Sequence, residues 1–252
     1  MNYKIIEELS LNNWQSLSTL LYDGWVLRFS NGYTIYANSI SSIYYSTYDL
    51  NQKIEECEKI YANNDLCPTF KITPFIKPEN LDDILEEKGY TLVDFRGTPY
   101  ISVQTMELDG IIEPTLHSVK LDEKINAEWL DHFCRLNNVE EKNKDTMIQM
   151  LSNIATKKCL VSLYKKDDVV ACGLGVIERD YIGLYDIVTD IKFRNQGLGK
   201  QLILNLLKWG KGNGAKYSYL TVLLNNESAL KLYSKIGFSE IYKYWYRVKE
   251  IV

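Results

Sequence analysis

One stretch of the sequence combines glycines and cations at a strand-to-helix turn. The apolar run from Leu184 to Thr189 indicates a strand, and Gly197 and Gly199 open a helix with an apolar residue at every third or fourth position. Glycine lets the backbone approach a ligand closely, and the free N–H groups at a helix start attract anions. Arg194 and Lys200 add positive charge. This turn therefore predicts binding of a phosphate or pyrophosphate group.

Spacing excludes two other loops that bind phosphate. A Rossmann dinucleotide motif needs a third glycine three residues after Gly199, where Leu202 stands. A P-loop needs a glycine five residues before the Gly-Lys pair and Ser or Thr after it, but Arg194 and Gln201 occupy those positions. The pattern that remains is Arg-x-x-Gly-x-Gly over residues 194–199.

A second segment adds a motif of its own. After a strand at about 217–223 come Asn226 and the pattern Ala-x-x-x-Tyr-x-x-x-Gly-Phe over residues 229–238. Its tyrosine, Tyr233, shares a helix face with apolar residues, so a core position is the alternative to a functional one. In this order and spacing, the two segments resemble the motifs of the GNAT N-acetyltransferases. The resemblance covers about residues 117–248.

The resemblance implies that acetyl-CoA is the co-substrate and assigns its contacts residue by residue. Backbone groups of Ile187, Val188 and Thr189 would pair with the pantetheine arm, and Asn226 would contact the same arm. The pyrophosphate would lie against the loop formed by Arg194, Asn195, Gln196, Gly197, Leu198, Gly199 and Lys200.

Acyl transfer from a thioester to an amine needs a deprotonated amine, an N–H group at the developing oxyanion and a proton for the leaving thiolate. By resemblance, Tyr233 is the candidate general acid and the Thr189 amide the candidate oxyanion donor; no metal is required. The expected reaction is acetyl transfer from acetyl-CoA to a primary amine, by direct attack in a ternary complex.

The general base is the part that the sequence leaves open. Some relatives carry a Glu on the strand before Asn226, but here Thr221 stands at that position and cannot deprotonate an ammonium. Glu178, Asp180 and Asp186 lie on or beside the central hairpin, where a solvated turn position is the alternative. Asp186, next to the cofactor strand, is the candidate catalytic residue. The missing Glu keeps a second function open, a non-catalytic acyl-CoA-binding or regulatory module.

The elements that must position these residues indicate an α+β (mixed α/β) fold. In the first half, Asn31-Gly32 between the β-rich runs 25–29 and 33–37 predicts a hairpin. Helices at about 51–63 and 79–88 and strands at 70–73, 91–95 and 100–108 follow. In the second half we expect strands at 117–121, 159–165, 168–178, 181–189, 217–223 and 239–248, and helices at 123–137, 143–156, 197–210 and 226–236.

A strand–helix–Gly-aromatic–strand pattern occurs in both halves when Gly89-Tyr90 is placed over Gly237-Phe238. It predicts tandem GNAT-like domains, each a twisted, mixed and mostly antiparallel sheet flanked by helices. Residues 1–110 would form a degenerate domain, and residues 117–252 the domain that binds acetyl-CoA. Pro78 and Leu85 stand where Asn226 and Tyr233 would be, so we expect the first domain to have lost the cofactor.

The first domain would instead help to form the acceptor cleft, since pockets favour domain interfaces. Its tyrosines either line that cleft or pack in the sheet; they are Tyr33, Tyr36, Tyr44, Tyr45 and Tyr48.

Composition narrows the remaining classes. The chain has 252 residues, 46% of them hydrophobic, and a net charge of −4, which excludes disorder as the main state. Lys and Arg (29) do not outnumber Asp and Glu (33), so a nucleic-acid footprint is not expected. No apolar run approaches the roughly 18–20 residues of a membrane span. Five scattered cysteines and two histidines favour a reducing cytoplasm over a metal site or disulfides. The amine acceptor, a small molecule or a peptide, and the oligomeric state stay open.

Overall fold

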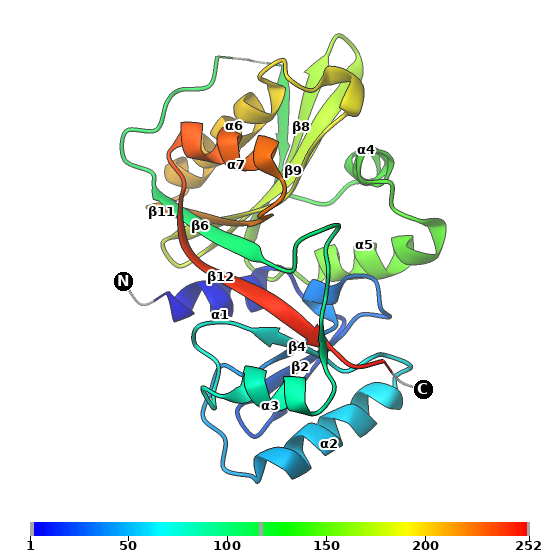
Figure 1. Ribbon diagram of the computed structural model, residues 1–252. Helices are drawn as coiled ribbons and strands as arrows, with labels where there is room; N and C mark the ends of the chain where they lie inside the picture. Colours follow the sequence, from blue (N-terminus) through cyan, green and yellow to red (C-terminus); the bar gives the residue numbers. More distant parts are fainter. Residues whose placement is uncertain (1–2, 116–117, 251–252) are drawn as a thin grey trace.

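The computed structural model describes residues 3–115 and 118–250, which form two halves of one molecule (Figure 1). The first half contains α1 (Lys4–Asn13), β1 (Ser18–Tyr22), β2 (Trp25–Phe29), β3 (Ile40–Ser41), α2 (Leu50–Ala62), β4 (Thr69–Ile72), α3 (Leu81–Glu87), β5 (Thr91–Leu92) and β6 (Ile101–Glu107). The second contains β7 (Val119–Asp122), α4 (Ala127–Asn137), α5 (Lys144–Ser152), β8 (Lys157–Lys165), β9 (Asp168–Glu178), β10 (Tyr181–Thr189), α6 (Leu198–Gly212), β11 (Tyr217–Leu223), α7 (Glu227–Ile236) and β12 (Ser239–Val248). Residue 117, where the strand before α4 was expected to begin, lies outside the described residues.

One twisted sheet runs through both halves in the order β1-β2-β3-β4-β12-β6-β11-β10-β9-β8-β7, and β5 pairs with β12. Most neighbouring strands are antiparallel, and the parallel pairs are β3 with β4 and β10 with β11. In the second half, α6 and α7 share one apolar core with the sheet, while α4 and α5 share another. The mixed, mostly antiparallel sheet flanked by helices is confirmed. No described helix is both long enough and apolar enough to cross a membrane.

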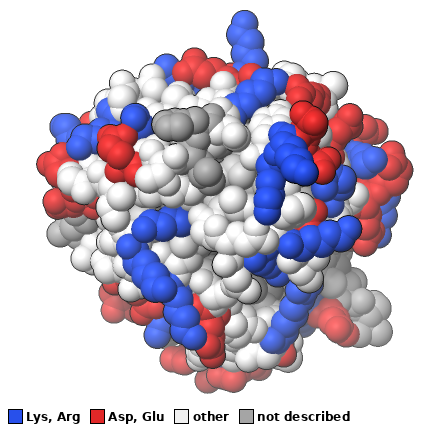
Figure 2. Space-filling model, turned by 90° about the horizontal axis from the view of Figure 1, so that it is seen from above, with Lys and Arg blue, Asp and Glu red and all other residues white. Residues whose placement is uncertain are grey.

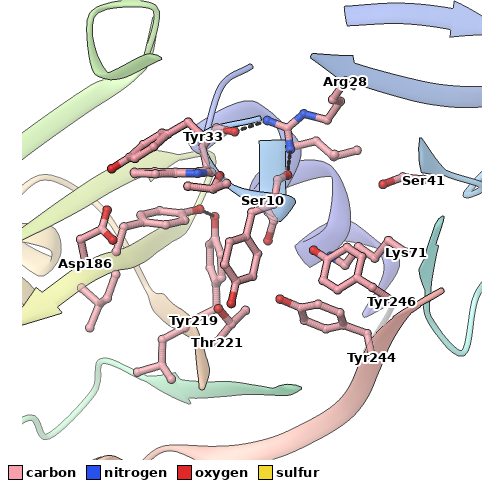
Figure 3. Close-up of a pocket in the computed structure, with 17 residues that line it drawn as sticks. Ser10, Arg28, Tyr33, Ser41, Lys71, Asp186, Tyr219, Thr221, Tyr244 and Tyr246 are labelled. Carbon is pink, nitrogen blue, oxygen red and sulfur yellow. Dashed lines mark hydrogen bonds between the residues drawn. The ribbon is translucent and has the colours of Figure 1, made fainter. Parts of the chain in front are cut away.

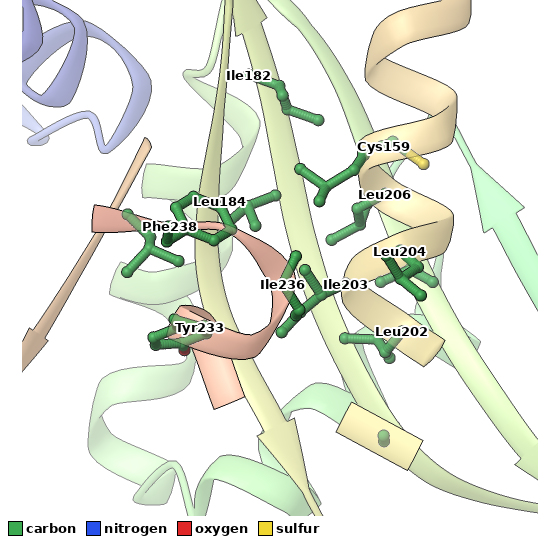
Figure 4. Packing of buried hydrophobic residues seen from close by; sticks show 14 of the residues in the cluster. Cys159, Ile182, Leu184, Leu202, Ile203, Leu204, Leu206, Tyr233, Ile236 and Phe238 are labelled. Atoms are coloured by element: carbon green, nitrogen blue, oxygen red, sulfur yellow. The ribbon is translucent and has the colours of Figure 1, made fainter. Parts of the chain in front are cut away.

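Helix α6 owes its position to a continuous apolar face. Leu202, Ile203 and Leu206 are fully buried in the core that α6 forms with the sheet (Figure 4). Burial of each such side chain contributes roughly 1.5–3 kcal/mol. A Cβ on Gly210 would lie 2.8 Å from Cδ1 of Ile182, so this glycine lets the helix come close to the sheet. The packing thereby fixes the start of α6 beside the end of β10.

Strands β10 and β11 are paired at one end only. Their parallel register links Tyr181 with Tyr217 and Gly183 with Tyr219, and no further pair follows. Beyond this point β10 continues to Thr189 along β9 alone. The two strands therefore diverge and leave one edge of each free.

The two halves exchange strands. β6, from the first half of the chain, lies between β11 and β12 and pairs with both. The last residues of β12, Trp245 to Val248, pair with β4 and, in part, with β5. Strands therefore cross the division that we expect between residues 110 and 117. The division itself stays a prediction, and the pairing shows that the halves share a continuous backbone ladder.

The first half repeats the central arrangement of the second. β3 runs parallel to β4 with Ile40 opposite Phe70, and the connection between them is α2. In the second half β10, α6 and β11 stand in the same relation. In both halves the crossover strand has an antiparallel neighbour from the other half, β12 for β4 and β6 for β11. This repetition agrees with the tandem arrangement expected from the repeat.

The hairpin expected at Asn31-Gly32 is wrong in its second strand. β2 pairs with β1 through a turn at Asp23 and Gly24, both at positive φ. After Gly32 the chain forms a loop with a short 3₁₀ helix at Ile35–Ala37. The side chain of Asn38 closes this loop: its Oδ1 accepts the N–H of Ser30 (2.7 Å), and its Nδ2 donates to the carbonyl of Thr34 (2.7 Å). These bonds satisfy the backbone locally and replace a strand ladder.

In the first half, a carboxylate of the chain itself lies at the loop that precedes α2. Asp23 accepts hydrogen bonds from the hydroxyl of Ser46 (2.6 Å) and from the N–H groups of Thr47 (2.9 Å) and Tyr48 (3.0 Å). The ammonium of Lys53, on α2, lies 3.2 Å from the same carboxylate and is fully buried. These bonds hold the pKa of Asp23 well below its usual value. The loop thus binds an internal anion and no longer offers these groups to a ligand.

We expect Asp23→Asn to lower the denaturation midpoint of the protein, because it leaves the buried Lys53 without a counter-ion. A carboxylate whose pKa is lowered by folding stabilises the folded state fully above its unfolded pKa of about 4, and this stabilisation is lost progressively as the pH falls from there toward the lowered folded pKa. The difference from wild type should therefore shrink between pH 7 and pH 3 in urea unfolding. The exposed Glu79→Gln is the matched control and should change little. An unchanged midpoint for Asp23→Asn at pH 7 would contradict the assignment.

Candidate active site

A bulge in β10 marks the edge of the gap between the diverging strands. The register of β10 with β9 shifts between Tyr185 and Val188, and Asp186, within the bulge, has a φ of 49°. Bulges change the direction of side chains and often lie next to functional sites. Here the bulge brings Asp186 to the wall of two adjoining cavities.

A groove of about 710 Å³ follows from the end of β10 over the start of α6 to α7. Among the described residues, the N–H groups of Leu198, Gly199 and Lys200 have no hydrogen-bond acceptor, as expected for the first turn of a helix. A Cβ on Gly197 would meet no atom within 4 Å, so this glycine faces open space. The groove therefore presents free donors at a helix start to any anion that enters it.

Charge in the groove favours an anionic guest. Its walls include four cationic residues, which are Arg194, Lys200, Lys231 and Lys235, against one carboxylate, Glu227. Figure 2 looks down on the end of the molecule where α6 begins and shows Lys and Arg side chains around an uncharged patch. A pyrophosphate linked to an extended arm fits these donors and charges, so the residues suit coenzyme A.

The residues expected to contact the cofactor arm differ in the hydrogen bonds that their backbone groups already make. Asp190 donates its N–H to Val170 O (2.8 Å). In an antiparallel ladder the backbone groups of successive residues point alternately toward and away from the neighbouring strand. The backbone of Val188 therefore points toward β9, and the N–H of Thr189 points away from β9. Arg194 Nε donates to Thr189 O (3.2 Å), which draws this side chain back toward β10. Ile187 lines the groove next to the bulge.

Two amide side chains of the predicted site have structural partners. The Oδ1 of Asn226 accepts the N–H of Ala229 (3.3 Å) and so caps α7, which leaves its Nδ2 as the free donor. The Oε1 of Gln196 accepts from Lys165 Nζ (2.8 Å), so this side chain is tied to the β8–β9 turn. Capping explains an Asn at position 226 whether or not a ligand contacts it.

Tyr233 lies where the groove meets the gap between the strands. It is 8% exposed and lines both cavities, and its ring packs edge-on against Phe238. No described residue is a hydrogen-bond partner of its hydroxyl, and burial raises the pKa of Tyr233 to about 12. The phenol is therefore both a core aromatic and a protonated donor at the cavity wall.

Only one of the three candidate carboxylates lies in the gap. Asp180 pairs with Lys216 (3.0 Å), and Glu178 accepts from Asn12 Nδ2 (2.9 Å). Asp186 lines the gap, and its buried Oδ2 has no hydrogen-bond partner among the described residues. Desolvation raises the pKa of Asp186 to about 7. A carboxylate with this pKa is suited to accept a proton near neutral pH.

A further cavity of about 260 Å³ lies between the two halves and shares Tyr36, Asp186 and Thr221 with the gap (Figure 3). Ser10, Trp14, Arg28, Tyr33, Thr34 and Ser41 come from the first half of the chain, and Tyr185, Tyr219, Tyr244 and Tyr246 from the second. The gap thus adjoins the cavity at Asp186 and the groove at Tyr233.

Of the five tyrosines considered for the acceptor cleft, Tyr33 and Tyr36 line the cavity, while Tyr44, Tyr45 and Tyr48 are exposed elsewhere on the first half. The sequence did not point to Trp14 or Arg28. Neither belongs to a motif, and only the exchange of strands between the halves brings them opposite Asp186.

The second half of the chain, which contains the groove, is similar to proteins of a known family. Residues 124–238 match the model of the acetyltransferase (GNAT) family. The chain is 29% identical over 249 residues to the uncharacterized N-acetyltransferase YobR of Bacillus subtilis, covering 97% of each protein. It is 27% identical over 92 residues to a [ribosomal protein bS18]-alanine N-acetyltransferase of Haemophilus ducreyi, covering 36% of this chain and 63% of that protein.

Solved structures show the same fold over the whole chain. A GCN5-related N-acetyltransferase from Kribbella flavida superposes with a TM-score of 0.74 at 14% identity, covering 100% of this chain and 96% of that one. A tandem GNAT protein from the clavulanic acid biosynthesis pathway gives 0.63 at 12% identity, covering 79% and 69%. The match at 124–238 spans the predicted motifs and the diverging strands, and this segment of the chain is a domain of the GNAT acetyltransferase family.

Proposed function

We propose that the protein is an acetyl-CoA-dependent N-acetyltransferase that acetylates a primary amine in a ternary complex. The observation that carries the proposal is that Tyr233 and Asp186 line the same gap, between the anion-binding groove and the interdomain cavity. The donor enters from the groove and the amine from the cavity, so that they meet between the diverging strands. Five free cysteines are consistent with a reducing compartment such as the cytoplasm.

The residues divide the work of the reaction. Acetyl-CoA supplies the acetyl group as a thioester. Asp186 takes a proton from the ammonium of the acceptor, and the free amine forms the new C–N bond as the C–S bond breaks. Tyr233 donates a proton to the leaving sulfur, and the second proton of the attacking nitrogen replaces the one that Tyr233 gave up. The N–H of Thr189, which is turned away from β9, would stabilise the negative charge that develops on the carbonyl oxygen.

Asp186 also bears on the alternative of a non-catalytic acyl-CoA-binding module. That alternative rests on Thr221, which replaces the Glu of some relatives. Thr221 and Asp186 line the same gap, so a carboxylate reaches this space from β10 instead of β11. Its free Oδ2 and the pKa near 7 favour turnover. The acceptor class stays at a primary amine, such as the ribosomal-protein alanine named for one relative or a small molecule.

Gly197→Asp should weaken acetyl-CoA binding at least about tenfold more than Gly197→Asn. Both side chains tolerate the left-handed backbone at this position, where φ is 77°, so the pair differs mainly in charge. A new negative charge within several ångströms of the pyrophosphate costs on the order of 1–4 kcal/mol. Calorimetric titration at low and high salt measures the difference. Equal affinities for the two variants would mean that the phosphates bind elsewhere.

Tyr233→Phe should lower kcat by about 100-fold and leave the KM for acetyl-CoA unchanged, because general acid catalysis contributes roughly 10²–10⁴-fold. Thiol release from acetyl-CoA in the presence of a turned-over amine is the measurement. Tyr217→Phe removes a hydroxyl at the far end of β11 and serves as the control. A kcat for Tyr233→Phe equal to that of wild type would exclude the tyrosine as the acid.

Asp186→Asn should remove the acidic limb from the pH profile of kcat/KM. In wild type we expect the rate to rise with pH and to reach half its plateau near pH 7, where the carboxyl loses its proton. Asn suits the positive φ of this position, so the variant changes the charge and little else. The rate of the variant should be about 100-fold lower. A profile that keeps the same limb in the variant would assign the titration to another group.

The same variant should be more stable than wild type at pH 8 and equally stable at pH 4. The folded protein binds the Asp186 proton more tightly than the unfolded chain does, so stability falls as the pH rises from about 4 to 7. Over that range the free energy of unfolding of the wild type falls by an amount on the order of 4 kcal/mol, and the Asn variant does not show this decrease because its side chain does not ionise. Urea unfolding at the two pH values measures it, with the exposed Asp180→Asn as control. A variant less stable than wild type at pH 8 would show that the buried charge is compensated.

A further inference from the structure

Arg28, in the wall of the cavity between the two halves, has no carboxylate among the described residues to balance its charge. Arg28, on β2, is 3% exposed. Its Nη1 donates to Tyr36 O (2.8 Å) and its Nη2 to Trp14 O. Burial lowers the pKa of Arg28 to about 10, and the groups that counter this effect are tyrosines. Arg28 forms no ion pair with any Asp or Glu that the structure describes. A buried guanidinium in this state favours an anion at the N–H groups that these two carbonyls leave unbonded.

The other charges on the cavity wall leave this cation unmatched. Lys71 lines the cavity too, but Glu7 lies 2.5 Å from its ammonium and neutralises it. Asp186 carries the opposite charge and likewise forms no ion pair with any described residue. In Figure 3 Asp186 lies on one side of the cavity, and Arg28, Ser41 and Lys71 lie on the other. The cavity thus presents a carboxylate at one side and a guanidinium at the opposite side, and neither has an ion-pair partner among the described residues.

Unpartnered polar atoms gather in the same wall. Three buried side-chain oxygens that line the cavity have no hydrogen-bond partner among the described residues: Thr34 Oγ1, Ser41 Oγ and Asp186 Oδ2. Ser41 is 2% exposed. Buried polar groups are normally hydrogen-bonded, so a polar molecule that enters the cavity would satisfy them. Between the two sides lie aromatic rings, among them Trp14 stacked on Tyr185 at 6.0 Å.

We propose that the acetyl acceptor is a small amino acid-like molecule, with a primary amine and a free carboxylate on one short skeleton. The inference rests on the proposed function and adds the acceptor class. The ammonium lies against Asp186 beside the gap, and the carboxylate accepts hydrogen bonds from Arg28 and Ser41. The rings of Trp14 and Tyr185 pack against the carbon skeleton between them. The cavity of about 260 Å³ admits a molecule of this size.

The test compares acceptors that differ only in the carboxylate. Calorimetry on the full chain saturated with coenzyme A would titrate a panel of free amino acids, including β-alanine and 4-aminobutyrate, each paired with its carboxamide, and a short peptide with a free N-terminal alanine. We expect at least one free acid to bind about tenfold or more tightly than its amide. If no free acid binds, if no acid exceeds its amide, or if the peptide binds best, the proposal is wrong.

Variants separate recognition by Arg28 from its bonds to Trp14 and Tyr36. Arg28→Gln should bring the acid-to-amide ratio to about one, and Arg28→Lys, which keeps the charge, should retain a clear preference for the acid. Arg179→Gln removes an exposed arginine and should leave the ratio unchanged. A variant that weakens acid and amide equally would assign Arg28 a structural role only. The wild-type ratio stands as a test even if Arg28→Gln does not fold.

Thiol release in the same panel distinguishes failure of this inference from failure of the proposed function. Acetylation of amines with no preference for a carboxylate would leave the acetyltransferase intact and overturn the acceptor class. Arg28-dependent binding of an amino acid without any thiol release would support the acceptor class and count against catalysis.

Discussion

Beyond Gly183 and Tyr219, no residue of β10 is paired with one of β11, and the proposed active site occupies the wedge between them. The side chains at its apex explain the divergence. A Cβ on Gly183 would lie 2.6 Å from the ring of Tyr219 and 2.7 Å from that of Tyr185, so the glycine makes room for both rings. Their hydroxyls share a hydrogen bond of 2.5 Å, and the ring of Trp14 stacks on Tyr185. Aromatic volume thus occupies the apex, and the bulge at Asp186 carries β10 away from β11.

The wedge needs a fixed far wall, and the exchange of strands supplies it. The edge of β11 that faces away from β10 pairs with β6, and β6 pairs in turn with β12. Because β12 continues along β4, the first half is bonded into the same ladder as the wedge. A buried cluster reinforces the junction, since Glu7 on α1 accepts from Lys71 on β4 and from the hydroxyl of Tyr242 on β12. Residues of the first half can therefore face Asp186 in a defined geometry.

Sequence patterns predicted the parts whose physics is local. Periodicity and glycine spacing gave the order of elements in the second half and the groove at α6, because both depend on residues a few positions apart. The Asn31-Gly32 hairpin was wrong because the side chain of Asn38, in the same loop, bonds the backbone in place of a second strand. Nothing local marks Arg28 or Trp14 as wall residues, since strand pairing over long separations brings them to the cavity. Asp186 could be named as a candidate, but its unpartnered oxygen depends on the packing around it.

The first half, which we propose no longer binds the cofactor, still contributes to the proposed site. In the second half the loop after β10 keeps its N–H groups free for an anion, whereas in the first half Asp23 takes up the hydrogen bonds of the loop before α2. The turn that contains Asp23 also begins β2, the strand that carries Arg28. The hydrogen bonds that Asp23 accepts from this loop therefore stabilise the start of β2, the strand that holds Arg28. We therefore propose that the first half no longer binds the cofactor, and that the turn at Asp23 instead helps to hold Arg28 in the wall of the acceptor cavity.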